Sequence, residues 1–494
     1  MEDFAENCDA ELEIRGRFCT LRIIEVALRG NCQLQPVLVL TSVGMTFPLR
    51  LVTGACRVSK IVALAFGTVV GVGLFGCGQG DPQAVATRAA CDADDGGLEL
   101  PADFCATVVA DTLGPTRHLA VAGNGDVYAA LDTTVNGNGI VALRDTDGDY
   151  TAETIEYFGD AAGSGLRLHG GNLYFGAHTA IWRYRRHPGD LIPSGSKEAV
   201  VTGFPEQPTH DAKSITFDGN GHLYVNVGAP SNACMEETRT KGSPGQDPCP
   251  QLATRAGVWQ FEADRHGQVH PDDGVRYATG IRNVNALRWS SATNNLYAVQ
   301  HGRDQLYAFF PELYTPKEGA ELPAEEVFKI DRGDNFGWPY CYYDWMEEKK
   351  VLMPEYGGDG QKVGRCSQFE APIQAFPGHW APNGLLFYTA DQFPEKYRQG
   401  AFIAWHGSWN RAPLPQQGYK VTYSPFDGKR PAGGFEVFAD GFAGADTLDS
   451  AGAAEYRPTG LALGPEGSLY VSDDAQGRIW RITYVGVQGA AAEQ

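Results

Sequence analysis

Residues 124–131 read NGDVYAAL, a turn followed by an alternating strand that carries Tyr128. The same pattern returns five times: GGNLYFGA at 170–177, NGHLYVNV at 220–227, TNNLYAVQ at 293–300, NGLLFYTA at 383–390 and EGSLYVSD at 466–473. The first three tyrosines are 46 and 50 residues apart, the length of one four-stranded propeller blade. The later spacings of 73, 91 and 82 residues correspond to a blade plus a long insertion.

These six copies predict an all-β chain, a six-bladed β-propeller with long inserted loops. The 61 glycines and 29 prolines suit many turns and few long helices. Turn–strand units also occur in β-sandwiches, so a generic all-β fold is the alternative. We expect the functional residues in the insertions rather than in the regular blades.

The charge of the chain limits its partners. A formal net charge of −20 over 494 residues argues against nucleic acid or an anionic lipid surface. Tight binding of an anionic ligand would therefore depend on a few placed arginines rather than on a general field.

The N-terminal region has the order of an export signal that begins at Met45. Basic residues precede an apolar run over 61–75, which is too short to span a bilayer comfortably. The sequence LFGC at 74–77 resembles the cleavage box of bacterial lipoproteins, with Cys77 as the lipidated first residue. Ordinary secretory cleavage nearby is the alternative. We expect a signal peptide over 45–76, preceded at 1–44 by a mis-assigned start that is not structured.

The mature chain then divides into three parts. We expect a tether and disulfide-bonded lead-in over 77–110, the propeller over 111–486 and a short tail over 487–494. The protein would be exported to the periplasm or the cell surface, as a lipoprotein anchored through Cys77.

The six cysteines beyond Cys77 support export, because an even set suits an oxidising compartment. About 15 pairings are open from the sequence alone. The six fall into three close couples: Cys91 with Cys105, Cys234 with Cys249, and Cys341 with Cys366. No CxxC spacing occurs, so disulfides are favoured over a zinc site.

Three segments near the repeated strands hold residues that could carry chemistry. His210 precedes one strand and could act as a general base, or lie in a surface loop. Arg282, next to Asn283, could hold a carboxylate or an oxyanion, or form an ion pair between blades. The third segment suits a polar ligand pocket or a packed turn and contains His406, Trp409, Asn410 and Arg411.

Together these segments resemble the glucose/sorbosone dehydrogenase family, in particular its sorbosone and pyranose dehydrogenase branch. The resemblance covers residues 113–485 and is carried by four strings: DNFGWPYCYYD at 334–344, PEYGGDG at 354–360, HWAPNGLLFY at 379–388 and HGSWNRAP at 406–413. It implies a propeller that uses pyrroloquinoline quinone (PQQ) with calcium to oxidise a sugar or a sugar-derived aldehyde. Electrons would pass to a separate acceptor, such as a cytochrome or a quinone.

The resemblance also implies roles for single residues. His210 would take a proton from a sugar hydroxyl as hydride leaves the same carbon for the quinone. Arg282 and Asn283 would lie against the cofactor, with Arg282 steadying charge on its quinone oxygens. The backbone carbonyls of Gly302 and Arg303 would bind Ca²⁺, although the glucose enzymes have Gly-Pro at these two positions.

Further positions are implied for holding the ligands. Arg411 and Arg457 match cationic residues that hold the cofactor's carboxylates. From residue type, we expect four residues to contact the sugar: Tyr343, His379, Trp380 and Trp409.

Two further points stay open from the sequence. A propeller of this kind could bind an extracellular ligand without catalysis, since a fold does not decide a function. Separately, Asp145, Asp147 and Asp149 alternate around a glycine as in calcium loops, although a turn between blades uses the same residues.

Overall fold

The computed structural model describes residues 9–14, 17–22 and 91–486. The expected signal peptide, the lipidation site Cys77 and the C-terminal tail fall outside these described residues. Strands β1 (Asp9–Ile14) and β2 (Arg17–Arg22) pair antiparallel, within the stretch that the sequence analysis expects not to be structured. They belong to a unit, residues 1–83, that is separate from residues 84–494.

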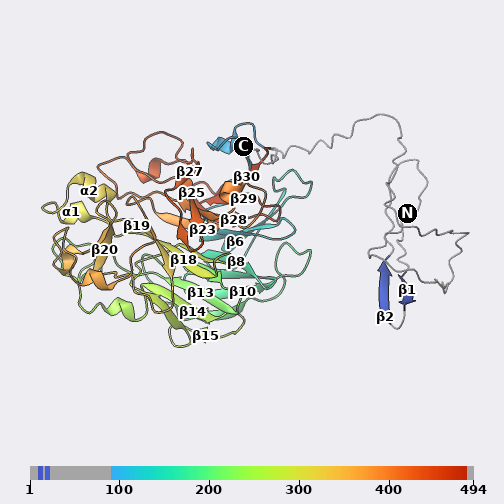
Figure 1. Cartoon of the computed structure of the whole chain (residues 1–494), viewed down its shortest axis with the longest axis horizontal. Helices are drawn as coiled ribbons and strands as arrows, with labels where there is room; N and C mark the ends of the chain where they lie inside the picture. The colour runs from blue at the N-terminus through green and yellow to red at the C-terminus, as the bar shows by residue number, and fades with distance from the viewer. Residues whose placement is uncertain (1–8, 15–16, 23–90, 487–494) are drawn as a thin grey trace, which may run out of the picture. The chain divides into compact units, whose positions relative to one another are not determined.

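Six antiparallel sheets form a propeller, which confirms the predicted architecture (Figure 1). The strands of each blade are given from the inner strand outward. Blade one contains β4 (Thr116–Val121), β5 (Val127–Val135), β6 (Asn138–Arg144) and β7 (Thr154–Phe158), and blade two contains β8 (Gly163–His169), β9 (Asn172–Ala177), β10 (Ile181–Arg185) and β11 (Glu198–Thr202). Blade three contains β12 (Ile215–Phe217), β13 (His222–Val227), β14 (Gly257–Glu262) and β16 (Val275–Thr279). Blade four contains β17 (Ala286–Ser290), β18 (Asn295–Gln300), β19 (Glu325–Ile330) and β22 (Gln374–Phe376). Blade five contains β23 (Pro382–Phe387), β24 (Gly400–Trp405), β25 (Lys420–Asp427) and β27 (Glu436–Ala439). Blade six contains β28 (Pro458–Leu463), β29 (Leu469–Asp473), β30 (Ile479–Tyr484) and β3 (Phe104–Ala110).

The last blade closes the ring with a strand from the other end of the propeller. β3 pairs antiparallel with β30, so the light-blue start of the propeller lies beside the C-terminal strand β30 in Figure 1. The propeller therefore takes in Phe104–Ala110, whereas the expected propeller begins at residue 111. The inner strands of successive blades contact one another around the whole ring. Closure of this kind leaves no long unpaired sheet edge around the axis.

The remaining elements are short and lie in the connections. They are α1 (Leu306–Phe309), α2 (Pro316–Glu321), β15 (Gln268–Val269), β20 (Cys341–Asp344), β21 (Lys349–Leu352), β26 (Arg430–Pro431), and the 3₁₀ turns η1 (Asp95–Gly97), η2 (Pro250–Ala253), η3 (Pro354–Tyr356), η4 (Gly364–Gln368), η5 (Glu395–Tyr397) and η6 (Ala451–Ala453). Among the described residues, no helix has the length and apolar character that a membrane span requires.

The repeated tyrosines join neighbouring blades. Their rings are buried, and several donate a hydrogen bond from the hydroxyl to a carbonyl of the next blade, as Tyr128 does to Leu191 at 2.8 Å and Tyr174 to Ala263 at 3.2 Å. Five of the six repeats lie on the second strand of a blade. The fifth lies on the inner strand β23, with Tyr388 directly after it, because β24 supplies the second strand there.

Three disulfides cross-link the close cysteine couples, as the spacing predicts. Cys234–Cys249 closes the connection between β13 and β14, and Cys341–Cys366 ties β20 to η4 within the insertion of the fourth blade. Cys91–Cys105 fastens the segment that precedes η1 to β3. Two of the long insertions are therefore held firmly beside the propeller rim.

Acid should weaken the fold through His270. This side chain is buried against Phe204 and Trp259, and burial lowers its pKa to about 4. The unfolded chain therefore binds the proton more readily, so the contribution is present above pH 6.5 and is lost as pH falls toward 4, at about 1.4 kcal/mol per pH unit. The free energy of unfolding, measured with urea, should fall less between pH 7 and pH 5 in His270→Asn than in the parent. Equal losses in both proteins would contradict this origin.

Candidate functional site

A polar cavity of about 280 Å³ lies at one end of the propeller axis. Its lining contains four histidines, four arginines and three carboxylates: His210, His301, His379, His406, Arg117, Arg239, Arg282, Arg457, Asp211, Asp304 and Glu325. A larger cavity of about 460 Å³, around Gln416 and Lys420, has no histidine or arginine in its lining.

The fold explains why these residues meet. In each blade the inner strand begins at the rim where the antiparallel second strand ends. Arg117 lies at the start of β4 and Arg457 directly precedes β28. His301 directly follows β18, and His406 directly follows β24. Because every blade is wound in the same way, residues far apart in the sequence converge at one end of the axis.

His210 is held with one ring nitrogen free. Its Nδ1 donates a hydrogen bond to the carbonyl of Ala229 at 2.6 Å, which leaves the lone pair on Nε2 available. Burial, and then the charge of Arg282, lower its pKa to about 3, so the ring stays neutral at physiological pH. His210 also has a positive φ of 56°, and its carbonyl accepts a hydrogen bond from Gln207 at 2.7 Å. A neutral, fixed imidazole of this kind can accept a proton.

Arg282 is fixed on all sides. Its guanidinium donates to the Gly302 carbonyl at 2.9 Å, to the Asp304 carboxylate at 2.9 Å and to the side-chain oxygen of Asn232 at 3.1 Å. Arg239 binds the same carboxylate at 2.6 Å. Two guanidinium groups thus hold the pKa of Asp304 well below its usual range, despite its burial. The group forms a rigid, charged wall of the cavity.

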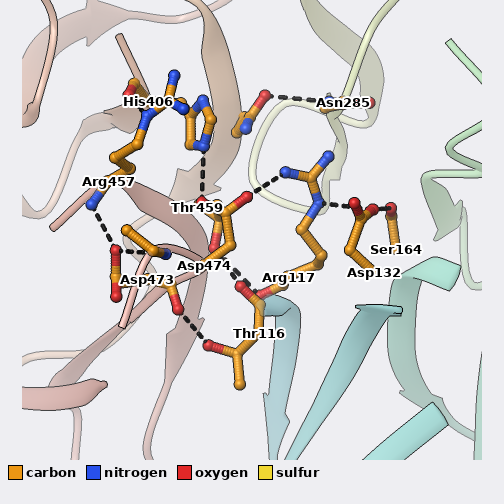
Figure 2. Close-up of polar contacts among 12 residues, drawn as sticks. Thr116, Arg117, Asp132, Ser164, Asn285, His406, Arg457, Thr459, Asp473 and Asp474 are labelled. Atoms are coloured by element: carbon orange, nitrogen blue, oxygen red, sulfur yellow. Dashed lines mark hydrogen bonds and ion pairs between the residues drawn. The ribbon is translucent and has the colours of Figure 1, made fainter. Parts of the chain in front are cut away.

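A second network lies on the opposite blades (Figure 2). Asp474 accepts a hydrogen bond from His406 Nε2 at 2.7 Å and pairs with Arg117 at 2.5 Å. Arg117 also pairs with Asp132 at 3.3 Å. The carboxylate of Asp474, which directly follows β29, therefore orients one cavity-lining histidine and one cavity-lining arginine from blades five and one.

Arg457 differs from the other cavity arginines. Its side chain donates to the carbonyls of His406 at 3.2 Å and Gly407 at 2.6 Å. Its backbone amide donates to the Asp473 carboxylate (Figure 2), but among the described residues its guanidinium forms no ion pair, whereas those of Arg117, Arg239 and Arg282 each pair with an aspartate. Its positive charge is therefore available to an anionic ligand.

Glu325 brings a buried carboxylate to the cavity from β19. It accepts hydrogen bonds from the backbone amides of Gly302 at 2.8 Å and Ala381 at 3.1 Å. Burial raises its pKa to about 7. Together with the Gly302 carbonyl, it makes this side of the cavity rich in oxygen atoms, the donors that Ca²⁺ prefers.

Seven of the sequence-predicted site residues line the cavity: His210, Arg282, Asn283, Gly302, His379, Trp409 and Arg457. Asn283 is buried and accepts a hydrogen bond from Asn226 at 3.2 Å. His379 is also buried and accepts one from the Asn410 amide at 3.2 Å. Trp409 is 53% exposed, so its ring is open to a ligand.

Four other predicted residues lie outside this lining. The side chain of Arg303 forms a fully buried ion pair with Glu355, at 2.6 Å. Arg411 binds Glu321 at 2.6 Å and two backbone carbonyls. Trp380 packs edge-on against Trp405, with ring centroids 5.5 Å apart, and Tyr343 lies half-buried on β20.

Sequence reasoning missed Arg117, His301, Glu325 and Asp474 as site residues. A signal was present, because three of them adjoin strands in a repeated manner. Arg117 lies at the start of an inner strand, and His301 and Asp474 directly follow second strands. A comparison of the polar residues at these two positions in every blade would have found them. Glu325 opens a third strand and gives no comparable signal.

The acidic loop proposed for a second calcium is compact. Oxygen atoms of Asp145, Asp147, Asp149 and Glu153 lie within 4.8 Å of one another. The same carboxylates also accept hydrogen bonds from amides of their own loop, as Asp145 does from Gly148 at 2.7 Å. This geometry serves a self-contained turn equally well, so the second calcium stays a prediction.

Adding a methyl group at Gly228 should disturb the site. A Cβ there would lie 2.7 Å from the Cβ of His210 and 2.6 Å from the side-chain oxygen of Asn283. We expect Gly228→Ala to destabilise the protein by about 1–3 kcal/mol and to move His210, because a packed site has no room for it. Urea unfolding checks the stability. Gly123→Ala is the control, since its Cβ would meet nothing within 4 Å; equal stability of both variants would contradict the prediction.

A family model and two curated proteins match this chain in sequence. The TrAA12-like family model matches residues 98–485. A PQQ-dependent pyranose dehydrogenase of Coprinopsis cinerea is 25% identical over 282 residues, which cover 49% of this chain and 36% of that protein. An uncharacterised protein of Borreliella burgdorferi is 30% identical over 209 residues, which cover 42% of this chain and 48% of that protein. The chain thus spans half or less of the length of these curated relatives.

Solved structures share the fold. The holo PQQ domain of pyranose dehydrogenase from Coprinopsis cinerea superposes with a TM-score of 0.61 at 18% identity, over 78% of this chain and 97% of that one. A calcium structure of a Trichoderma reesei carbohydrate-active enzyme of family AA12 gives a TM-score of 0.63 at 16% identity, with coverage of 78% and 97%. At these identities, the likeness shows the propeller fold alone.

Proposed function

Because this chain belongs to the TrAA12-like family, we propose that it is a PQQ-dependent dehydrogenase that oxidises a sugar or a sugar-derived aldehyde. The sequence relative from Coprinopsis cinerea, a PQQ-dependent pyranose dehydrogenase, supports this class of cofactor and substrate. One observation in the structure carries the proposal: a base and a guanidinium group without an ion pair face the same polar cavity. These are His210, with its Nε2 free, and Arg457, whose guanidinium pairs with no carboxylate among the described residues.

The cavity fits PQQ in charge. The cofactor is a flat tricarboxylate, so it needs cationic donors at fixed positions. Arg457 would hold one carboxylate, and Arg282 and Asn283 would lie along the ring, where Arg282 is immobilised by Asp304. When bound, PQQ supplies the oxidising capacity for the two electrons that leave the substrate carbon with its hydrogen.

A calcium ion fits the oxygen-rich side of the cavity. We propose the backbone carbonyls of Gly302 and Arg303 as its ligands, as the family resemblance implies. Gly302 lines the cavity, as do Asp304 and Glu325, whose carboxyl oxygens suit a hard cation. That carbonyl also accepts a hydrogen bond from Arg282, so the ion would share its oxygen. The side chain of Arg303 points into its ion pair with Glu355, which leaves a role only for its backbone.

His210 performs the proton step. Its neutral Nε2 takes the proton of a substrate hydroxyl, and the hydrogen bond from Nδ1 to Ala229 stabilises the ring while it carries the extra proton. Trp409 offers an exposed aromatic face to the C–H surface of a sugar, and His379 lines the cavity from the segment that precedes β23. The electrons then pass to a separate acceptor, a cytochrome or a quinone. Export to an oxidising compartment is supported by the three disulfides.

Reconstitution tests this function. Purified protein loaded with PQQ and Ca²⁺ should retain the cofactor through gel filtration and reduce an artificial dye when aldoses, aldosones or other pyranoses are added. Retained PQQ with no dye reduction across the panel would contradict the dehydrogenase and favour a propeller that only binds its ligand.

A further inference from the structure

Gln207 joins the backbone of His210 to the end of β13, although Gln207 itself lies outside the cavity lining. It stands three residues before His210, in the loop that leads to β12. Its Nε2 donates to the carbonyl of His210 at 2.7 Å and to that of Gly228, directly after β13, at 3.1 Å. The carbonyl of Thr209 lies 2.9 Å from the same nitrogen. One side-chain amide thus connects two segments that are 18 residues apart in the sequence.

Arg255 determines which end of this amide faces the carbonyls. Its Nε donates to the Oε1 of Gln207 at 3.2 Å, so the amide oxygen faces a guanidinium group and the amide nitrogen faces only carbonyls. The reverse orientation would place donor against donor and acceptor against acceptor. The two amide hydrogens serve three carbonyls, so one of them is shared. The orientation of the Gln207 amide is therefore fixed at both ends.

The segment that Gln207 holds is the one that the ring of His210 contacts. The carbonyl of Ala229, next to Gly228, accepts the hydrogen bond from His210 Nδ1 at 2.6 Å. The backbone amide of Ala229 donates in turn to the carbonyl of Arg282 at 2.7 Å. The residues after β13 are thus fixed to Arg282, and Gln207 fixes His210 to those residues.

The backbone of His210 needs such a restraint. Its φ of 56° lies in the left-handed region, which residues other than glycine seldom adopt. A conformation of this kind persists only where the surrounding structure holds it. Gly228 packs closely here, because a Cβ on it would lie 2.7 Å from the carbonyl oxygen of His210. Among the described residues, the amide of Gln207 is the one group that donates to that carbonyl.

We propose that Gln207, oriented by Arg255, is a positioning residue for His210. It holds the backbone of His210 against residues 228–229, so that Nδ1–H stays on the Ala229 carbonyl and Nε2 stays free to take a substrate proton. The effect on turnover rests on the proposed function, whereas the restraint on the ring needs neither PQQ nor a sugar.

The first measurement is made on the protein without PQQ. With ¹⁵N-labelled histidine, the ring-nitrogen spectrum at pH 7 distinguishes a protonated nitrogen from an unprotonated one, and His210→Ala identifies the His210 signals. The parent should show a single tautomer at His210, with the proton on Nδ1. Gln207→Met, which has a similar length and no donor, should show a mixture of the two tautomers.

Gln246→Met is the matched control for this spectrum. Gln246 also donates from Nε2 to a backbone carbonyl, that of Met235 at 3.0 Å, and it lies outside the cavity lining. Its replacement removes a hydrogen bond of the same kind and should leave the His210 signals as in the parent. Arg255→Met should give the same change as Gln207→Met but a smaller one, because the amide keeps its donors and loses only its orientation.

The second measurement is turnover after loading with PQQ and Ca²⁺. Gln207→Met should lower kcat by about 10- to 100-fold, since a catalytic group displaced by about 1 Å loses rate on this scale. KM and the affinity for PQQ should change little, because Gln207 lies outside the cavity lining. Gln246→Met should turn over like the parent.

The outcomes separate this inference from the proposed function. An unchanged His210 spectrum in Gln207→Met and in Arg255→Met would overturn the positioning role, and Arg255→Met alone decides if Gln207→Met does not fold. Full turnover by a variant with mixed tautomers would overturn it too. Mixed tautomers in the variants, with no sugar oxidised by the parent, would contradict the dehydrogenase and support the restraint on the ring.

Discussion

Replacing His210 by alanine should lower kcat for sugar oxidation by about 10²–10⁴-fold, the usual effect of removing a general base. The affinity for PQQ should change little, because the imidazole acts on the substrate proton rather than on the cofactor's carboxylates. The free Nε2, with Nδ1 tied to Ala229 at 2.6 Å, is the geometric reason for this expectation. Steady-state dye reduction gives kcat, and a fluorescence titration gives the dissociation constant of PQQ.

The control for this variant is His187→Ala, at an exposed histidine away from the cavity lining. It should behave as the parent in both measurements. If His210→Ala kept kcat within about threefold of the parent, the base would have to be another cavity histidine, and the assignment of His210 would be wrong.

Replacing Arg457 by glutamine should weaken PQQ binding by about 30- to 1,000-fold, as removal of one partner of a desolvated charge pair does. Among the described residues, Arg457 is the cavity arginine whose guanidinium forms no ion pair, so no carboxylate of the protein competes for direct contact with it. Glutamine keeps a hydrogen-bond donor but removes the charge. Equilibrium dialysis with PQQ measures the change directly.

Arg332→Gln, at an exposed arginine, is the matched control and should bind PQQ like the parent. Arg411→Gln distinguishes two assignments, because the family resemblance implies that Arg411 holds a carboxylate of the cofactor, whereas the structure places Arg411 outside the cavity lining. Arg411 is bound to Glu321 at 2.6 Å and lies outside the cavity lining. A loss of PQQ affinity in Arg411→Gln, with none in Arg457→Gln, would contradict the proposed role of Arg457.

The fold could be predicted because one residue marks each repeat. The tyrosine of each repeat fills the core, and four of the six, such as Tyr128, also donate a hydrogen bond to the next blade, so a tyrosine recurs wherever a blade does. The copy around Tyr388 shows the limit of the pattern. A turn followed by an alternating strand describes an inner strand as well as a second one, and only the pairing of β23 with β24 distinguishes them.

The candidate site could be predicted only in part. His210, Arg282 and Gly302 belong to distinctive strings, and the structure brings all three to one cavity. Trp380 belongs to such a string too, but its side chain packs against Trp405. Residue type alone does not show which way a side chain points.

Asp474 was missed for a different reason. It joins Arg117, 357 residues away in the sequence, through the closure of the ring. No local pattern reports that contact.

The most direct test of the central claim is the absorption spectrum of the PQQ-loaded protein under anaerobic conditions, before and after one equivalent of an oxidisable sugar from the reconstitution screen. If the protein is a PQQ-dependent sugar dehydrogenase, the spectrum of the bound cofactor should convert fully to that of its reduced form, and His210→Ala should convert it at least about 100-fold more slowly. An unchanged spectrum, with PQQ shown to be bound and each sugar of the panel tried in turn, would contradict the claim.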